Sequence, residues 1–241
     1  VFETYHFAYD DSCIREVVDS IQPDVTVFMG AFDTNYHWDK RQSRPVTYTA
    51  GVFNLLTAHI ALGKGRFIYL SSEEVFQGEY AEEITDDMPC TVHTDKAQAI
   101  AAGEDICCSY RRMGKDTVVL RLDHLYGVPK DVGETKNACA RMIIEGLETG
   151  EIQVDEAQRM ALLHYRDAVE FIYYVIAAKE TRQGLCQISS GEPLSQRTIA
   201  EYIAGALKDV KLVDAPQRQR MEPVLSNTLF EEEFGIRIYQ K

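Results

Sequence analysis

Short apolar segments alternate with amphipathic stretches along most of this chain, and few folds accommodate that alternation. The apolar segments are residues 24–31, 66–70, 117–122 and 185–189, and the amphipathic stretches are 13–21, 46–61, 96–113, 137–149, 167–179 and 196–207. Such apolar runs are typical of strands buried on both faces, and the stretches between them are typical of crossover helices. The pattern predicts the fold class α/β, with parallel strands covered by helices.

Composition excludes several kinds of partner. The chain has 25 Lys and Arg against 38 Asp and Glu, a net charge of −13 at pH 7 that repels phosphate backbones, so we expect no nucleic-acid partner. No apolar run approaches the roughly 18 residues of a membrane span, so we expect no membrane partner. The six cysteines form no C-x-x-C pair and have no histidines at zinc spacing. We therefore predict no metal site, and reduced thiols in a cytoplasmic protein.

The carboxyl ends of the predicted strands are where ligands bind in open α/β sheets. Three such ends fall at residues 29–31, 71–74 and 123–127. The second end carries Ser72, Glu73 and Glu74. A hydroxyl can hydrogen-bond a substrate oxygen, and two carboxylates in different environments can serve as acid and base. The alternative is that a serine caps a following turn while both carboxylates are solvated.

Six segments occur in an order and at a spacing that one known family shares. They are PDVTVFMGA at 23–31, GVFNLL at 51–56, SSEEVF at 71–76, RLDHLYG at 121–127, LHYRDA at 163–168 and ISSGEPLS at 188–195. These segments resemble motifs of the extended short-chain dehydrogenases, the nucleotide-sugar epimerase and dehydratase family. The resemblance implies a Rossmann-like, doubly wound parallel sheet with a smaller C-terminal substrate-binding region.

The same resemblance implies a division of the chain. Residues 1–127, with about 162–190, correspond to the dinucleotide-binding domain, and 128–161 with 191–241 correspond to the smaller region. The family opens with a strand, a G-x-x-G-x-x-G turn and a helix, which the sequence does not contain. Since a βαβ unit takes 30 or more residues, we expect roughly 40 to 60 residues ahead of Val1. NAD or NADP is the implied cofactor, and we expect this chain to bind it weakly without the helix that holds the pyrophosphate.

An acidic pair directly after the serine is, within that family, most typical of nucleotide-sugar 4,6-dehydratases such as the dTDP-glucose enzymes. By resemblance, Ser72 hydrogen-bonds the sugar 4-oxygen during oxidation by NAD(P). Glu73 then protonates the leaving hydroxyl at carbon 6, and Glu74 removes the proton at carbon 5, which the 4-keto group has made acidic. The resemblance also implies a homodimer formed through the helices predicted over 46–61 and 96–113.

The family's central motif, Y-x-x-x-K, is absent from its expected place. Gly103 and Glu104 resemble the A-G-E that follows this motif, which puts Lys96 at the tyrosine place and Ile100 at the lysine place. A register with Lys96 as the motif's lysine would put Val92 at the tyrosine place. A desolvated lysine can act as a base, so Lys96 is a candidate catalytic residue. The alternative is an exposed lysine in the first turn of a helix.

The remaining candidates follow from family position. The candidate cofactor contacts are Gly30, Ala31, Tyr48 and Ser71, and the candidate substrate contacts are His124, Asn137 and Arg159. Tyr48 and His124 each stand where the family usually has an asparagine. Arg159 lies one place before the position of the phosphate-binding arginine. His124 either contacts substrate or caps the end of its strand.

Two functions remain open at this level. The first is an NAD(P)-dependent nucleotide-sugar epimerase or dehydratase, dehydratase-like in its acidic pair. The second is a non-catalytic relative that keeps the fold to bind a nucleotide sugar, a cofactor or a partner subunit. The acidic pair favours the enzyme and the absent Y-x-x-x-K favours the relative; we predict an enzyme with an atypical active site.

Overall fold

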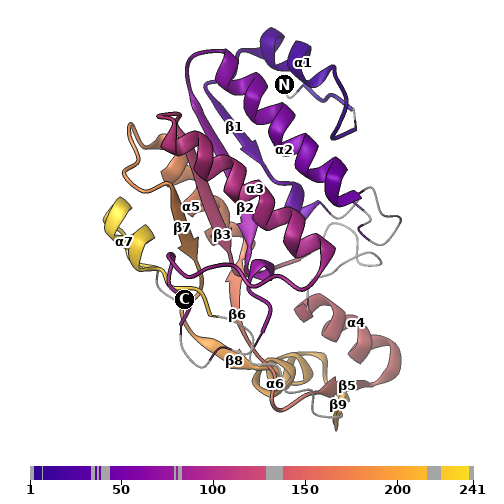
Figure 1. Ribbon diagram of the computed structural model, residues 1–241. Helices are drawn as coiled ribbons and strands as arrows, with labels where there is room; N and C mark the ends of the chain where they lie inside the picture. Colours follow the sequence, from indigo (N-terminus) through magenta and orange to yellow (C-terminus); the bar gives the residue numbers. More distant parts are fainter. Residues whose placement is uncertain are drawn as a thin grey trace.

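A computed structural model of the chain describes residues 3–6, 8–33, 36, 38, 44–78, 80, 83–128, 138–215 and 224–238. The main sheet of this part consists of β1 (Val25–Phe28), β2 (Arg66–Ser72), β3 (Thr117–Leu122) and β7 (Leu185–Ile188). All four strands are parallel and lie in the order β1-β2-β3-β7 (Figure 1). The predicted α/β fold with a parallel sheet is confirmed.

Helices cover both faces of this sheet. One face carries α2 (Arg44–Ala61) and α3 (Asp95–Arg112), with α1 (Ile14–Ile21) packed on α2. The other face carries α5 (Tyr165–Ala177) and α7 (Thr228–Phe234) (Figure 1). All seven residues of β2 are buried, with Phe67 and Tyr69 in the core under α2 and α3, and Ile68 and Leu70 in the core on the opposite face. Burial on both faces explains why this strand is an unbroken apolar run.

A second group of elements lies at one end of the main sheet (Figure 1). It contains α4 (Ala138–Thr149), β5 (Glu151–Val154), α6 (Gln196–Leu207) and β9 (Lys211–Asp214). Its core is formed by Met142, Ile152, Val154, Met160, Ile199 and Ala200. A three-stranded sheet of β4 (His124–Tyr126), β6 (Arg159–His164) and β8 (Pro193–Ser195) lies between the two groups. The domain limits set out above stay a prediction.

Several predicted elements differ from the structure at their ends. The strand predicted over 24–31 ends at Phe28, because Gly30–Phe32 forms a 3₁₀ turn in which the Phe32 amide donates to Met29. The helix predicted over 167–179 begins at Tyr165, where the His164 side chain accepts a hydrogen bond from the amide of Arg166. The residues after α6, for which no element was predicted, contribute β9 and α7. Phe230 of α7 is fully buried against the sheet, and such packing leaves little trace in local sequence.

None of the helices in the described part of the chain combines the length and the apolar character needed to cross a membrane.

Candidate active site

The register of the main sheet brings the loops after three strands to one place. Ser72 of β2 is paired with Leu122 of β3, and Leu122 is paired with Ile188 of β7. The next residues, Glu73, Asp123 and Ser189, therefore leave the sheet side by side at its carboxyl edge. This is the edge where open α/β sheets bind ligands.

The turn after β2 is fixed by its own serine. The Ser72 hydroxyl accepts a hydrogen bond of 3.2 Å from the amide of Glu74, which begins the 3₁₀ turn η2 (Glu73–Val75). Ser72 thus caps the turn, as the alternative interpretation expected, and its side chain is buried. The two carboxylates are not simply solvated, because each has a charged or titratable partner on another element.

Glu73 is the more buried of the two carboxylates, with 10% of its side chain exposed. Burial raises its pKa from 4.5 to about 7; His124 opposes this effect, while the nearby Asp123 and Glu74 add to it. A carboxyl group with a pKa near neutrality is still partly protonated at neutral pH and can donate that proton during a reaction. Glu73 therefore has the properties of a general acid.

His124 lies between two carboxylates. Its Nε2 is 3.4 Å from Oε1 of Glu73, and its Nδ1 is 3.2 Å from Oδ1 of Asp123. Asp123 is fully buried and accepts hydrogen bonds from the His124 amide (2.8 Å) and the Ser189 hydroxyl (2.7 Å). Asn227 in turn holds the backbone of Ser189 through two hydrogen bonds, of 2.7 and 2.9 Å. His124 thus faces Glu73 on one side, and Asp123 orients the ring from the other.

Glu74 is paired with Lys96, which lies in the first turn of α3. The Lys96 ammonium forms an ion pair with Oε1 of Glu74 and lies 6.0 Å from the ring centroid of Trp38. Its side chain is 22% exposed, so it is not the solvated lysine of the alternative interpretation. The amide of Ala97 donates to the Thr94 hydroxyl, which caps α3 and sets the position of this first turn.

A buried ion pair fixes α3 to the sheet behind these groups. Arg121 of β3 donates two hydrogen bonds to Glu104 of α3, of 2.9 and 2.8 Å, and both side chains are at most 5% exposed. The Arg121 guanidinium also lies 4.8 Å from the ring centroid of Phe76, just beyond the acidic pair. A planar, two-point contact of this kind holds the helix and the turn in one orientation.

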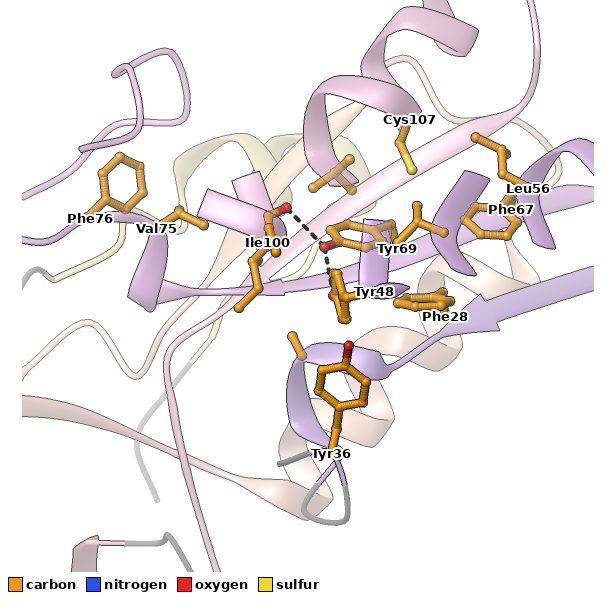
Figure 2. Close-up of a cluster of buried hydrophobic side chains, with 14 of the residues drawn as sticks. Phe28, Tyr36, Tyr48, Leu56, Phe67, Tyr69, Val75, Phe76, Ile100 and Cys107 are labelled. Atoms are coloured by element: carbon orange, nitrogen blue, oxygen red, sulfur yellow. Dashed lines mark hydrogen bonds between the residues drawn. The ribbon is translucent and has the colours of Figure 1, made fainter. Parts of the chain in front are cut away.

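Of the residues predicted to contact NAD(P), Tyr48 packs inside the protein. It is fully buried in an aromatic cluster, and its hydroxyl is 2.8 Å from that of Tyr69 (Figure 2). Tyr69 in turn donates to the carbonyl of Ile100, at 2.9 Å. Ile100, predicted from the sequence to stand at the family's lysine place, is itself fully buried.

The other three candidate cofactor contacts are also buried. A side-chain carbon on Gly30 would lie 2.6 Å from the ring of Phe28 and 2.8 Å from that of Tyr48, so aromatic rings already fill this space. Ala31 is 6% exposed, and Ser71 is fully buried with no hydrogen-bond partner for its hydroxyl among the described residues. These positions present no polar group to a dinucleotide.

A cavity of about 470 Å³ opens beside the end of β1, next to Gly30. Among the described residues that line it, Asp33 is the one that carries a charge, and the others are apolar, aromatic or glycine. A carboxylate repels a pyrophosphate, and the lining offers no cation to hold one. The described residues therefore do not fit NAD(P) in the way that the resemblance implies.

The residues predicted to contact substrate do not lie together in the structure. His124 lies in the acid–base group, whereas Arg159 is exposed at the start of β6, opposite Ser195 of β8. Since His124 is paired with Leu162, Arg159 lies three positions before that level, about 10 Å along the strand. Asn137 lies outside the described residues.

The sequence interpretation missed Asp123, Ser189 and Asn227. Asp123 directly precedes His124, and an acidic residue beside a histidine at a strand end was a usable signal. Ser189 is 66 positions from Asp123, and Asn227 is a further 38 along, so only the fold brings them together.

Comparison with known proteins gives a family and a fold. Residues 8–186 match the model of the NAD dependent epimerase/dehydratase family. No curated protein matches this chain in sequence.

Among solved structures, the dTDP-glucose 4,6-dehydratase of Streptomyces venezuelae, solved with NAD, is 21% identical with a TM-score of 0.80, and the match covers 98% of this chain and 74% of that one. The UDP-glucose 4-epimerase of Thermotoga maritima, solved with UDP-glucose, is 19% identical with a TM-score of 0.82, covering 96% and 77%. The UDP-glucose 4-epimerase of Thermus thermophilus, solved with NAD, is 20% identical with a TM-score of 0.80, covering 96% and 78%. These likenesses confirm the Rossmann-like fold, and with a family match over most of its length the chain belongs to the NAD-dependent epimerase/dehydratase family.

Proposed function

We propose that this protein eliminates water from a nucleoside-diphosphate sugar, in the manner of a 4,6-dehydratase, with Glu73 as the acid and Glu74 as the base. The observation that carries the proposal is the difference between two adjacent carboxylates. Glu73 is buried with a pKa of about 7, whereas Glu74 is ion-paired with Lys96. Environments that differ in this way give one carboxyl group the role of proton donor and the other that of proton acceptor.

The elimination follows from these positions. Glu74 takes the proton from carbon 5 of a sugar with a carbonyl at carbon 4, and the C–H electron pair moves toward that carbonyl. The electrons return to form the double bond between carbons 5 and 6 as the C6–O bond breaks. Glu73 gives its proton to the departing oxygen, which leaves as water. The Lys96 ammonium orients Glu74 through this step.

The test is water loss from a nucleoside-diphosphate 4-ketohexose, a substrate that needs no oxidation by NAD⁺, followed by mass spectrometry. We expect Glu73→Gln and Glu74→Gln each to lower turnover by about 10² or more. Glu170→Gln, at an exposed position of α5, is the matched control and should turn over normally. Undiminished turnover in the Glu73→Gln/Glu74→Gln double variant contradicts the proposal.

A second function is favoured by one specific observation. The place of the family's lysine is taken by the buried Ile100, so the usual tyrosine–lysine pair is absent. This favours a non-catalytic relative that binds a nucleotide sugar or a partner subunit. Calorimetric binding of a nucleoside-diphosphate sugar without any turnover would support this second function over the first.

Weak binding of NAD(P) is part of the same proposal. The four candidate contacts are buried, and the cavity beside β1 carries a carboxylate. We expect no NAD⁺ or NADP⁺ binding in the micromolar range by calorimetry on this chain. A micromolar dissociation constant would contradict that expectation. A cytoplasmic location likewise stays a prediction.

We also propose a homodimer through α2 and α3. A shallow apolar groove runs between these helices, lined by Pro45, Val46, Thr49, Ala50, Phe53, Gln98, Ala99, Ala102 and Ile106. Val46 and Phe53 are 70% and 47% exposed, and exposed apolar residues that line one groove mark a surface for a partner. A second copy related by a two-fold axis would cover both.

A further inference from the structure

We propose that His124 is the proton relay of Glu73, and that the imidazole, held in place by Asp123, returns a proton from solvent to Glu73 after each elimination. This inference rests on the proposed role of Glu73 as the acid. It concerns a step that the acidic pair cannot complete alone, because Glu73 ends the elimination as a buried carboxylate.

The first support is that the His124 side chain is more exposed to solvent than the Glu73 side chain it contacts. The Glu73 side chain is 10% exposed and that of His124 is 27% exposed, with 3.4 Å between Oε1 and Nε2. The imidazole therefore lies on the solvent side of the carboxyl group. Catalytic hydrogen bonds are often this long before substrate binds and shorten in the complex.

The second support is that Asp123 decides which ring nitrogen carries hydrogen. An ionised carboxylate only accepts hydrogen bonds, so Nδ1 of His124, 3.2 Å from Oδ1 of Asp123, must be the N–H that faces it. Asp123 cannot turn away, because the Ser189 hydroxyl donates to its other oxygen at 2.7 Å and the His124 amide donates to Oδ1. Nε2, 3.4 Å from Oε1 of Glu73, is the ring nitrogen that exchanges a proton with that carboxyl group.

The third support is the charge around the ring. The carboxylates that contact the ring are Glu73, on the turn after β2, and Asp123, the residue directly before His124. From α4 the neighbour is Cys139, and burial raises the pKa of that thiol, so it stays neutral. A ring facing carboxylates on both nitrogens is stabilised when it becomes imidazolium, the form that must carry the proton inward.

The proton balance closes. In the elimination Glu74 gains the proton from carbon 5 and Glu73 loses one to the departing water. Imidazolium then gives its Nε2 proton to Glu73, takes another from solvent, and Glu74 releases its proton to solvent. No oxidant or reductant enters this exchange.

The first experiment compares His124→Asn and His124→Gln with His93→Asn, a control at an exposed loop position, after thermal melts have shown all three to be folded. We expect the first turnover, measured below pH 7, to survive in the His124 variants, because most of the Glu73 groups then start with their proton. Steady-state turnover should fall at least tenfold and be restored by added imidazole. Asp123→Asn should show the same steady-state loss with partial rescue, which a merely structural role would not give.

The second experiment is ¹⁵N NMR of the His124 ring, which needs no turnover. We expect the Nδ1–H tautomer in the neutral ring, and a titration that moves to lower pH in Glu73→Gln because the facing carboxylate is gone. An Nε2–H tautomer, or a titration unchanged in Glu73→Gln, overturns the relay whatever the activity.

The outcomes separate the two proposals. Normal turnover in Glu73→Gln overturns the role of Glu73, and the relay with it. Loss of turnover in Glu73→Gln together with normal steady-state turnover and a normal pH profile in His124→Asn overturns the relay alone. If both variants lose turnover, and imidazole restores it only in His124→Asn, the result supports both the role of Glu73 as the acid and the relay by His124.

Discussion

Lys96 forms an ion pair with Glu74, although 22 positions separate the two residues in the chain. The contact joins the first turn of α3 to the turn after β2. It places a cation next to Glu74, the proposed base. The acidic pair Glu73 and Glu74 thus resembles that of the family, and Lys96 adds an ion-pair partner for Glu74.

Lys96→Met keeps the length of the side chain and removes its charge. We expect turnover to fall by about 10², because Glu74 loses the group that orients it toward carbon 5. Lys115→Met, in the exposed turn after α3, is the control and should turn over normally. Equal rates for Lys96→Met and the wild type, measured at saturating substrate, would show that the ion pair has no part in the reaction.

The pH dependence of stability should change in Glu73→Gln. The native pKa of Glu73 is raised from 4.5 to about 7, so the folded protein holds this proton more tightly than the unfolded chain does. The group's contribution to stability is present below pH 4.5 and is lost as the pH rises through 7. Glutamine stays neutral, so the free energy of unfolding of Glu73→Gln should exceed that of the wild type by about 3 kcal/mol above pH 7.

Urea unfolding at pH 4.5 and pH 8 measures this difference directly. The two proteins should be nearly equally stable at the lower pH, and Glu170→Gln should follow the wild type at both. A Glu73→Gln variant that is less stable than the wild type at pH 8 would contradict this prediction. It would mean that the neighbours of Glu73 stabilise its charged form more than burial destabilises it.

Gly103→Ala should destabilise the protein through the tyrosine pair. A Cβ at position 103 would lie 2.4 Å from the Tyr69 hydroxyl oxygen, which donates to Ile100 and contacts the hydroxyl of Tyr48 (Figure 2). Either α3 moves away from β2 or these hydrogen bonds break, at a cost of about 2 kcal/mol.

Gly205→Ala in α6 provides the matched comparison, since a Cβ there has nothing within 4 Å. This second change should stabilise the protein by about 0.5–1 kcal/mol, because alanine favours helix. Thermal melts of both variants measure the contrast. Equal melting temperatures for the two alanine variants would contradict the close packing between α3 and Tyr69.

Phe53→Glu should convert a dimer to a monomer. Phe53 is 47% exposed on α2 and lines the groove between α2 and α3, where two glutamates would be buried against each other in a two-fold dimer. Light scattering with size-exclusion chromatography measures the mass. Val169→Glu, at an exposed position of α5, is the control and should stay dimeric. A monomeric wild type would overturn the proposed interface.

Local sequence was enough to predict most of the fold. The run that became β2 is apolar at every position because both faces of a central parallel strand are buried. The predicted ends of the strands and helices were less accurate than their existence and type. Gly30 and Ala31 were expected to continue β1, but contacts with the rings of Phe28 and Tyr48 favour a tight turn at Gly30.

The sequence by itself determined that a serine and two glutamates follow a buried strand, because that order is covalent. Only the tertiary structure made the two glutamates different. Burial and His124 set the protonation of Glu73, while Lys96 holds Glu74. Those neighbours come from β4 and α3, and the pKa of a carboxyl group depends on distance and dielectric, which the order of residues does not contain.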